Sequence, residues 1–145
     1  MPLPNFDANE NFPPGIHSCT WNEARDTLAF NPRRKELFEG LLRACEILKR
    51  AGCKTIYIGG SFATSKEFPG DFDVCWDDND IELKFLFELD PTLLDFSNKR
   101  AAQKAKYGGE LFLASTVADA QGQTYLEFFQ KDRTGNPKGI VQISL

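Results

Sequence analysis

The sequence contains very little histidine, and its cysteines are scattered. One of the 145 residues is a histidine, His17, and none of the four cysteines has the Cys-x-x-Cys spacing. A structural zinc site needs about four nitrogen or sulfur ligands at short spacing, and this pattern does not supply them. A secreted disulfide framework also fits poorly, because the first residues do not form a signal peptide. We therefore expect a cytoplasmic protein whose cysteines are reduced and buried.

Long apolar runs and an excess of positive charge are missing as well. No stretch approaches the ~20 apolar residues of a transmembrane helix, so we expect no membrane contact. The formal net charge is −4 and the pI is about 5.0, so any RNA or DNA contact would need a local basic patch. A length of 145 residues with 41% hydrophobic content predicts one domain with one core.

The first 19 residues predict an extended arm that lies on the domain. Four of the eight prolines occur there, and the hydrophobic residues show little periodicity. Phe6, Phe12 and Ile16 are the residues expected to anchor this arm. We interpret His17 as structural or solvent-exposed, because a lone histidine in a proline-rich arm has no catalytic partner in the pattern.

Two helices are predicted directly after the arm. Thr20 and Glu23 have the spacing of a capping box, which begins the first helix. Asn31 followed by Pro32 begins the second helix, and apolar residues spaced three and four apart continue it to about Ala51. The basic residues of the second helix are expected on its solvated face: Arg33, Arg34, Lys35, Arg43, Lys49 and Arg50.

Four apolar segments predict the strands of one mixed sheet, with the second helix packed on one face. The strands are residues 53–58, 72–76, 110–113 and 139–144. The domain that contains them, residues 20–145, is therefore expected to be α+β.

A basic helix is predicted over residues 98–107, ending at Gly108, because strong helix formers run through it. It carries the densest basic cluster of an acidic chain. A solvated helix face and a phosphate or RNA contact are both open for its cations, Lys99, Arg100, Lys104 and Lys106.

The stretch Ile56–Trp76, IYIGGSFATSKEFPGDFDVCW, carries the chemistry. A strand ends at a Gly-Gly-Ser turn, whose backbone N–H groups and hydroxyl suit a phosphate. Asp71 and Asp73 are two apart, so an extended backbone places both carboxylates on one face. Two carboxylates on one face repel each other unless a cation lies between them, and Mg²⁺ is held by such carboxylates together with substrate phosphates. The pattern predicts a metal–triphosphate site.

At these residues the sequence resembles the DNA-polymerase-beta-type nucleotidyltransferase superfamily. The signature there is a hydrophobic residue, Gly-Ser or Gly-Gly, a gap of roughly ten residues, and Asp-hydrophobic-Asp-hydrophobic. Here it reads Ile58, Gly60-Ser61 and Asp71-Phe72-Asp73-Val74. The likeness is to small stand-alone bacterial and phage members, and it extends along most of the chain, including residues 96–112 and 132–145.

The resemblance implies a single nucleotidyltransferase-like domain that transfers NMP from an NTP with Mg²⁺ or Mn²⁺. It also implies a third carboxylate on a later strand, for which Glu110 is the candidate, as a metal ligand or general base. The superfamily more often has Asp at this position. Asp71, Asp73 and Glu110 are thus the expected catalytic and metal-binding residues. The nucleotide phosphates would lie against Gly59, Gly60, Ser61 and Lys66.

Three functions remain open from the sequence. The first is an enzyme whose acceptor is RNA, a protein or a small molecule. The second is a catalytically weak domain of the same fold that acts by protein contact, such as a partner in a toxin–antitoxin or phage-defence pair. The third, a metal-dependent nuclease, explains the paired aspartates but not the Gly-Gly-Ser turn.

Overall fold

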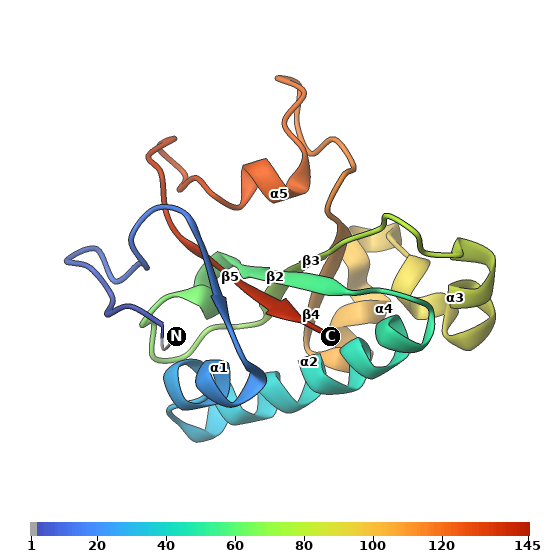
Figure 1. Ribbon diagram of the computed structural model, residues 1–145, viewed down its shortest axis with the longest axis horizontal. Coiled ribbons are helices and arrows are strands. Elements are labelled where there is room, and N and C mark those ends of the chain that lie inside the picture. The colour runs from blue at the N-terminus through green and yellow to red at the C-terminus, as the bar shows by residue number, and fades with distance from the viewer. Residues whose placement is uncertain (1–2) are drawn as a thin grey trace.

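A computed structural model describes residues 3–145 and contains five strands (Figure 1). The strands are β1 Ile16–Cys19, β2 Thr55–Gly59, β3 Phe72–Trp76, β4 Gly109–Leu113 and β5 Ile140–Ser144. The α-helices are α1 Trp21–Leu28, α2 Pro32–Arg50, α3 Leu83–Leu89, α4 Ser97–Tyr107 and α5 Tyr125–Phe128. Two short 3-10 helices are η1 Gly60–Ala63 and η2 Pro91–Leu94. The first two residues of the predicted arm lie outside the described residues.

The strands form one mixed sheet in the order β1-β5-β2-β3-β4. β2 is antiparallel to both of its neighbours, whereas β1 pairs with β5, and β3 with β4, in parallel. This confirms the α+β class and the mixed sheet predicted from the sequence. The fifth strand, β1, was not predicted. It comes from the end of the proline-rich arm, where no residue is buried, and its pairing with β5 makes it a strand.

The two faces of the sheet are covered by different parts of the chain. Because alternate residues of a strand point to opposite faces, Phe72, Val74 and Trp76 are buried in the main core beneath the sheet. Helices α1, α2 and α4 lie on this side, and α5 with its flanking loops stands on the other (Figure 1). Cys75 and Phe112 belong to a smaller cluster on the α5 side. The odd-numbered residues of β3 therefore face α5.

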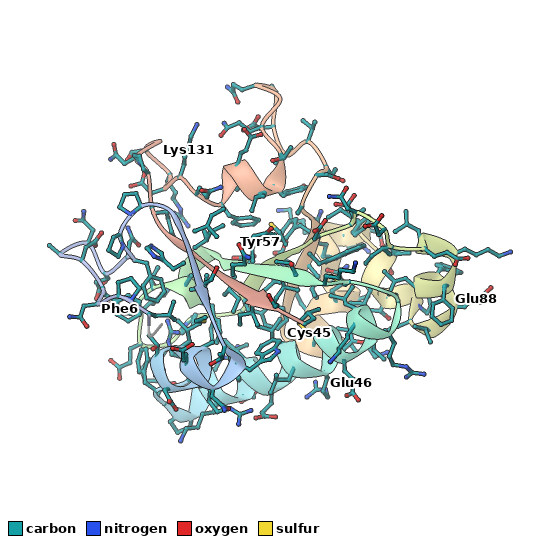
Figure 2. All side chains as sticks on the ribbon, in the orientation of Figure 1. Phe6, Cys45, Glu46, Tyr57, Glu88 and Lys131 are labelled. Carbon is teal, nitrogen blue, oxygen red and sulfur yellow. The ribbon has the colours of Figure 1, made fainter. Side chains whose placement is uncertain are left out.

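The first two helices begin at the predicted residues. Thr20 and Glu23 form the capping box of α1, and the Asn31 side chain accepts a hydrogen bond from the Arg34 amide at the start of α2. Side chains on the outer face of α2, such as that of Glu46, point away from the sheet, whereas Cys45 is buried (Figure 2). These local signals were readable because they depend on residues three or four apart.

Helix α4 differs from the predicted helix in its first turn. Residues Asn98–Arg100 have φ values of 51° to 59°, in the left-handed region. Each such residue costs roughly 1–2 kcal/mol relative to right-handed backbone. The turn brings the Arg100 guanidinium to 4.0 Å from the centre of the Phe112 ring, on the α5 side of the sheet. Tertiary contacts have overridden helix propensity here.

The N-terminal arm is fixed by one of its three predicted anchors above all. Phe12 is fully buried, and the Phe6 ring lies 4.5 Å from it between centroids. Ile16 is 42% exposed and is not an anchor. The His17 ring nitrogen Nε2 lies 2.6 Å from the Pro13 carbonyl oxygen, which accounts for this histidine as a structural residue.

All four cysteines are free, as predicted. Cys45, Cys53 and Cys75 are buried, but Cys19 is only partly buried, because it lies in the edge strand β1. Burial raises the pKa of the Cys53 thiol to about 11. Among the helices of residues 3–145, none has the length and apolar character needed to cross a membrane.

Candidate functional site

Asp71 and Asp73 lie where β3 begins, on the face that α5 covers. Asp73 is paired with Gly59 of β2 on one side and with Glu110 of β4 on the other. Asp71 directly precedes the strand. The structure therefore brings the sequence-predicted aspartates together beside the Gly-Gly-Ser turn, because β2 and β3 are antiparallel neighbours.

The glycines of the turn are required by what packs against them. A side chain at Gly60 would overlap the Asp73 carboxylate, and Gly60 has φ +61°. A Cβ atom at Gly59 would come within 2.9 Å of Phe129. Gly60 therefore allows a carboxylate to lie directly on the turn, and Gly59 allows an aromatic ring to do so. Ser61 follows Gly60 in η1.

The loop after the turn is held from inside by Arg34, which is fully buried. Its guanidinium donates hydrogen bonds to backbone carbonyls of that loop: Ser61, Phe62, Thr64 and Lys66. It also donates to the Leu28 carbonyl and lies over the Phe30 and Phe62 rings. The prediction that Arg34 belongs to the solvated face of its helix is wrong.

Arg34 also places a positive charge beneath the turn. Burial lowers its pKa to about 10, so it stays protonated at neutral pH. Among residues 3–145 no carboxylate forms an ion pair with it. Its guanidinium contacts backbone carbonyls and aromatic rings rather than a carboxylate, so a net positive charge lies beneath the turn and favours an anion there.

A cleft of about 1330 Å³ opens above these residues. Its floor contains Gly60, Ser61, Lys66, Asp71 and Asp73. Its opposite wall is the segment between β4 and β5, which carries α5 and rises from the sheet (Figure 1). Lys131 of this segment and Tyr57 on the sheet below it are labelled in Figure 2. Pockets of about 300–1,000 Å³ hold small ligands, so this cleft has room for a nucleotide and more.

The two aspartates carry unbalanced negative charge. Burial, with Asp71 and Glu110 nearby, raises the pKa of Asp73 to about 7. Burial and Glu110 also raise the pKa of Asp71, against the effect of Lys104, Arg33 and Lys66. Within the described residues, neither carboxylate accepts a hydrogen bond or forms an ion pair. A pair of this kind suits a bound cation.

Glu110 lies next to Asp73 in the sheet, but its carboxylate is already engaged. Lys104 Nζ lies 3.0 Å from Glu110 Oε1, and Arg100 Nη1 lies 3.9 Å from Oε2. Both cations come from α4, which packs against β4, the strand at that edge of the sheet. This explains why an acidic residue is tolerated at the start of an otherwise apolar strand. Glu110 does not line the cleft.

The four predicted basic contacts of α4 do not share one face toward the cleft. Arg100 and Lys104 bind Glu110, and the Lys106 ammonium lies 2.9 Å from the Asp90 carboxylate. Lys99 lies in the left-handed turn. Most of this charge is therefore used within the chain. Lys104 and Lys106 also border a second, smaller cavity of about 310 Å³.

The smaller cavity adjoins the cleft at Asp71, which lines both. Its other charged residues are mostly basic: Arg33, Glu36, Arg43, Lys104 and Lys106. Asp71 can thus be reached both from the cleft and from the smaller cavity.

Lys138 was missed by the sequence reasoning. It lies before β5, and its ammonium is 3.5 Å from the Gly60 carbonyl oxygen. Burial lowers its pKa, and the nearby Asp132 and Asp73 act in the opposite direction. It is the cation of the C-terminal segment that reaches the turn. The turn-rich sequence around it gave no sign of this, because only the pairing of β5 with β2 brings it there.

The donor set fits a divalent cation in part. Within the described part of the chain, no group of three or more His, Cys, Asp or Glu side chains is placed to hold a metal ion. Asp71 and Asp73 alone would supply two carboxylates, the number with which proteins commonly hold Mg²⁺ when substrate phosphates complete the shell. The residues therefore fit a metal that is held jointly with a polyphosphate.

A comparison with protein-family models places the chain among known sequences. The model described as "Family of unknown function (DUF6932)" matches residues 4–144. The chain belongs to DUF6932. No curated protein and no solved structure matches it. The matched range includes the turn, both aspartates, Glu110 and Lys138.

Proposed function

We propose that this protein is a metal-dependent nucleotidyltransferase that transfers NMP from an NTP to an acceptor. One observation carries the proposal: the Asp73 carboxylate lies against Gly60 of the turn, and it lines a cleft of about 1330 Å³ together with Asp71 and Ser61, with no ion pair to either aspartate among residues 3–145. The turn suits phosphates, and the carboxylates suit a divalent cation.

The residues divide the work as follows. Asp71 and Asp73 would hold Mg²⁺ or Mn²⁺ together with the triphosphate. A divalent ion in such a site neutralises charge on the phosphates and activates the attacking oxygen. Ser61 and the turn bind the β- and γ-phosphates, with Lys138 and Lys66 as cations at the cleft. Arg34 keeps the loop in shape from beneath.

The acceptor is proposed to approach from the smaller cavity. That cavity shares Asp71 with the cleft and is bordered by four cations, so an acceptor that carries a phosphate would be favoured there. RNA ends, modified proteins and phosphorylated small molecules share this chemistry. The net charge of −4 and the internal pairing of the α4 cations do not favour a long nucleic acid.

A second function is supported by Glu110. Its carboxylate is held by Lys104 and Arg100 rather than directed to the aspartates. A site with two carboxylates and no third would bind metal and nucleotide with little turnover. In that case the protein would act as a nucleotide-dependent binding partner in the cytoplasm, for example in a toxin–antitoxin or phage-defence pair.

The test is incubation of the protein with each labelled NTP, Mg²⁺ and a cell extract, followed by detection of label on RNA, protein and small molecules. The enzyme proposal predicts labelling by the wild type, lost with chelator and in Asp71→Ala/Asp73→Ala. Labelling by neither protein, together with Mg²⁺-dependent nucleotide binding, would favour the binding partner instead.

A further inference from the structure

The cleft has an aromatic wall, formed by Tyr125, Phe128 and Phe129 of α5 and the residue after it. Phe129 and Tyr125 are packed into the smaller cluster against Phe112, with ring centroids 5.1 and 4.5 Å from that of Phe112. Phe128 is different. It is 45% exposed, and among residues 3–145 the one aromatic ring that it contacts is that of Phe129, at 5.4 Å between centroids in a T-shaped arrangement.

The aromatic wall is close to the phosphate turn. Phe129 lies against Gly59, where a Cβ atom would be 2.9 Å from it. The next residue, Gly60, lies against the Asp73 carboxylate. Phe128 is therefore one ring away from the turn, and both line the same cleft. The shared cleft therefore suits a ligand with a flat apolar end and a charged end.

Cations lie on the same segment, beyond the wall. Lys131, Arg133 and Lys138 all line the cleft, and Lys138 reaches the Gly60 carbonyl. Sites for nucleotides and single-stranded nucleic acids combine aromatic side chains, on which bases stack, with positive charges that meet phosphates. The cleft offers both, with the aromatic ring and the turn at separate positions.

We propose that Phe128 is the stacking surface for a nucleobase, so that the cleft binds a whole nucleoside triphosphate rather than polyphosphate alone. The triphosphate lies on the Gly60–Ser61 turn and the aspartates, and the base lies on Phe128. This inference rests on the proposed function for the position of the phosphates. It adds the part of the site that recognises the nucleoside.

The experiment compares two probes, ATP and inorganic tripolyphosphate, by calorimetric titration in Mg²⁺. The wild type should bind ATP more tightly than tripolyphosphate. Because stacking on an aromatic residue is worth roughly 1–3 kcal/mol per base, Phe128→Ala should weaken ATP binding by about 5- to 150-fold and leave tripolyphosphate binding unchanged. Phe128→Trp keeps a flat ring and should restore the preference for ATP.

Two further variants make the comparison specific. Phe87→Ala removes a phenylalanine of similar exposure, 57%, from α3 outside the cleft, and should change neither affinity. Phe128→Leu keeps an apolar contact with Phe129 without a flat ring, and should behave like Phe128→Ala even if the alanine variant is less stable.

The outcomes separate the two proposals. Tripolyphosphate binding with an ATP preference that survives in Phe128→Ala and Phe128→Leu would overturn the stacking site and leave the metal–phosphate site intact. No Mg²⁺-dependent binding of either probe by the wild type would overturn both.

Discussion

Asp73 and Glu110 are register partners in the parallel pair β3–β4, yet their carboxylates are in different electrostatic surroundings. The Asp73 carboxylate forms no ion pair among residues 3–145, and its pKa is raised to about 7, chiefly by burial and against the effect of Lys104 and Lys138. The Glu110 carboxylate is bound by Lys104 at 3.0 Å. On neighbouring strands, the Asp73 carboxylate is thus free to bind a cation, whereas the Glu110 carboxylate is already paired with a lysine.

Glu110→Gln tests whether Glu110 takes part in turnover. It keeps the size of the side chain and removes its charge, so folding and Mg²⁺–nucleotide affinity should persist. If Glu110 is a general base or metal ligand, labelling from NTP should fall by roughly two or more orders of magnitude. The measurement is the rate of label transfer at saturating nucleotide.

The control for Glu110 is Lys104→Met, which breaks the same ion pair from the other side. Equal labelling by the wild type and Glu110→Gln would show that Glu110 is only the partner of α4. Its loss should then resemble that of Lys104 in a denaturation experiment.

Lys138→Ala should weaken nucleotide binding. The ammonium is partly buried beside the Gly60 carbonyl, and charged hydrogen bonds contribute roughly 1.5–3 kcal/mol. We expect an increase in Kd of about 10- to 150-fold. Lys49→Ala, at an exposed residue of α2 that does not line the cleft, is the matched control and should leave Kd unchanged. A similar effect of both variants would point to general attraction by positive charge instead.

Arg34→Met should destabilise the fold and disturb the phosphate turn. It leaves several inward-facing carbonyls of residues 61–66 without a donor, and a buried unsatisfied group costs about 1–3 kcal/mol. We expect the free energy of unfolding in urea to fall by about 3 kcal/mol. Arg25→Met, which loses an exposed ion pair with Glu39 and a cation–π contact with Phe38, should change it by roughly 1 kcal/mol. Equal effects of the two substitutions would contradict the role given to Arg34.

The Asp90 carboxylate should make stability depend on acid pH. Burial would raise its pKa, but hydrogen bonds from Tyr107, Lys106 and Thr92 outweigh burial and lower it. A carboxylate with a lowered pKa in the folded state stabilises above its unfolded pKa of about 3.9, and this contribution is lost as the pH falls through the folded pKa.

Asp90→Asn checks this dependence. The stability difference between wild type and variant should be present at pH 7 and shrink as the pH falls below about 4. The measurement is urea unfolding at a series of pH values, with Asp26→Asn, at an exposed carboxylate of α1, as the control. A difference that grows toward low pH would have the wrong sign for this explanation.

The sequence was informative where the structure depends on near neighbours. The capping box at Thr20, the Asn31 cap and the turn followed by two aspartates all follow from short spacings, and the structure has them at the predicted residues. The antiparallel pairing of β2 with β3 then brings the turn and Asp73 together. Local rules therefore indicated the fold class and the centre of the candidate site.

The residues that were missed depend on contacts between distant parts of the chain. Arg34 lies in a run of charged residues, and only the loop about thirty residues later turns it into a buried side chain. Lys138 reaches the cleft because β5 lies beside β2, and Phe128 lies there because its neighbours Tyr125 and Phe129 pack against Phe112 of β4. The sequence of β1 does not alternate apolar and polar residues, and this strand depends on its pairing with β5. None of these partners is visible from spacing.

The central claim is that Asp71 and Asp73 bind a nucleoside triphosphate through a divalent cation. Isothermal titration with ATP, in Mg²⁺ and in chelator, tests it most directly. We predict binding by the wild type that requires Mg²⁺ or Mn²⁺ and is lost in Asp71→Ala/Asp73→Ala, while the variant keeps the wild-type fold by circular dichroism. Unchanged ATP affinity in the folded double variant, or equal affinity with chelator, would contradict the claim.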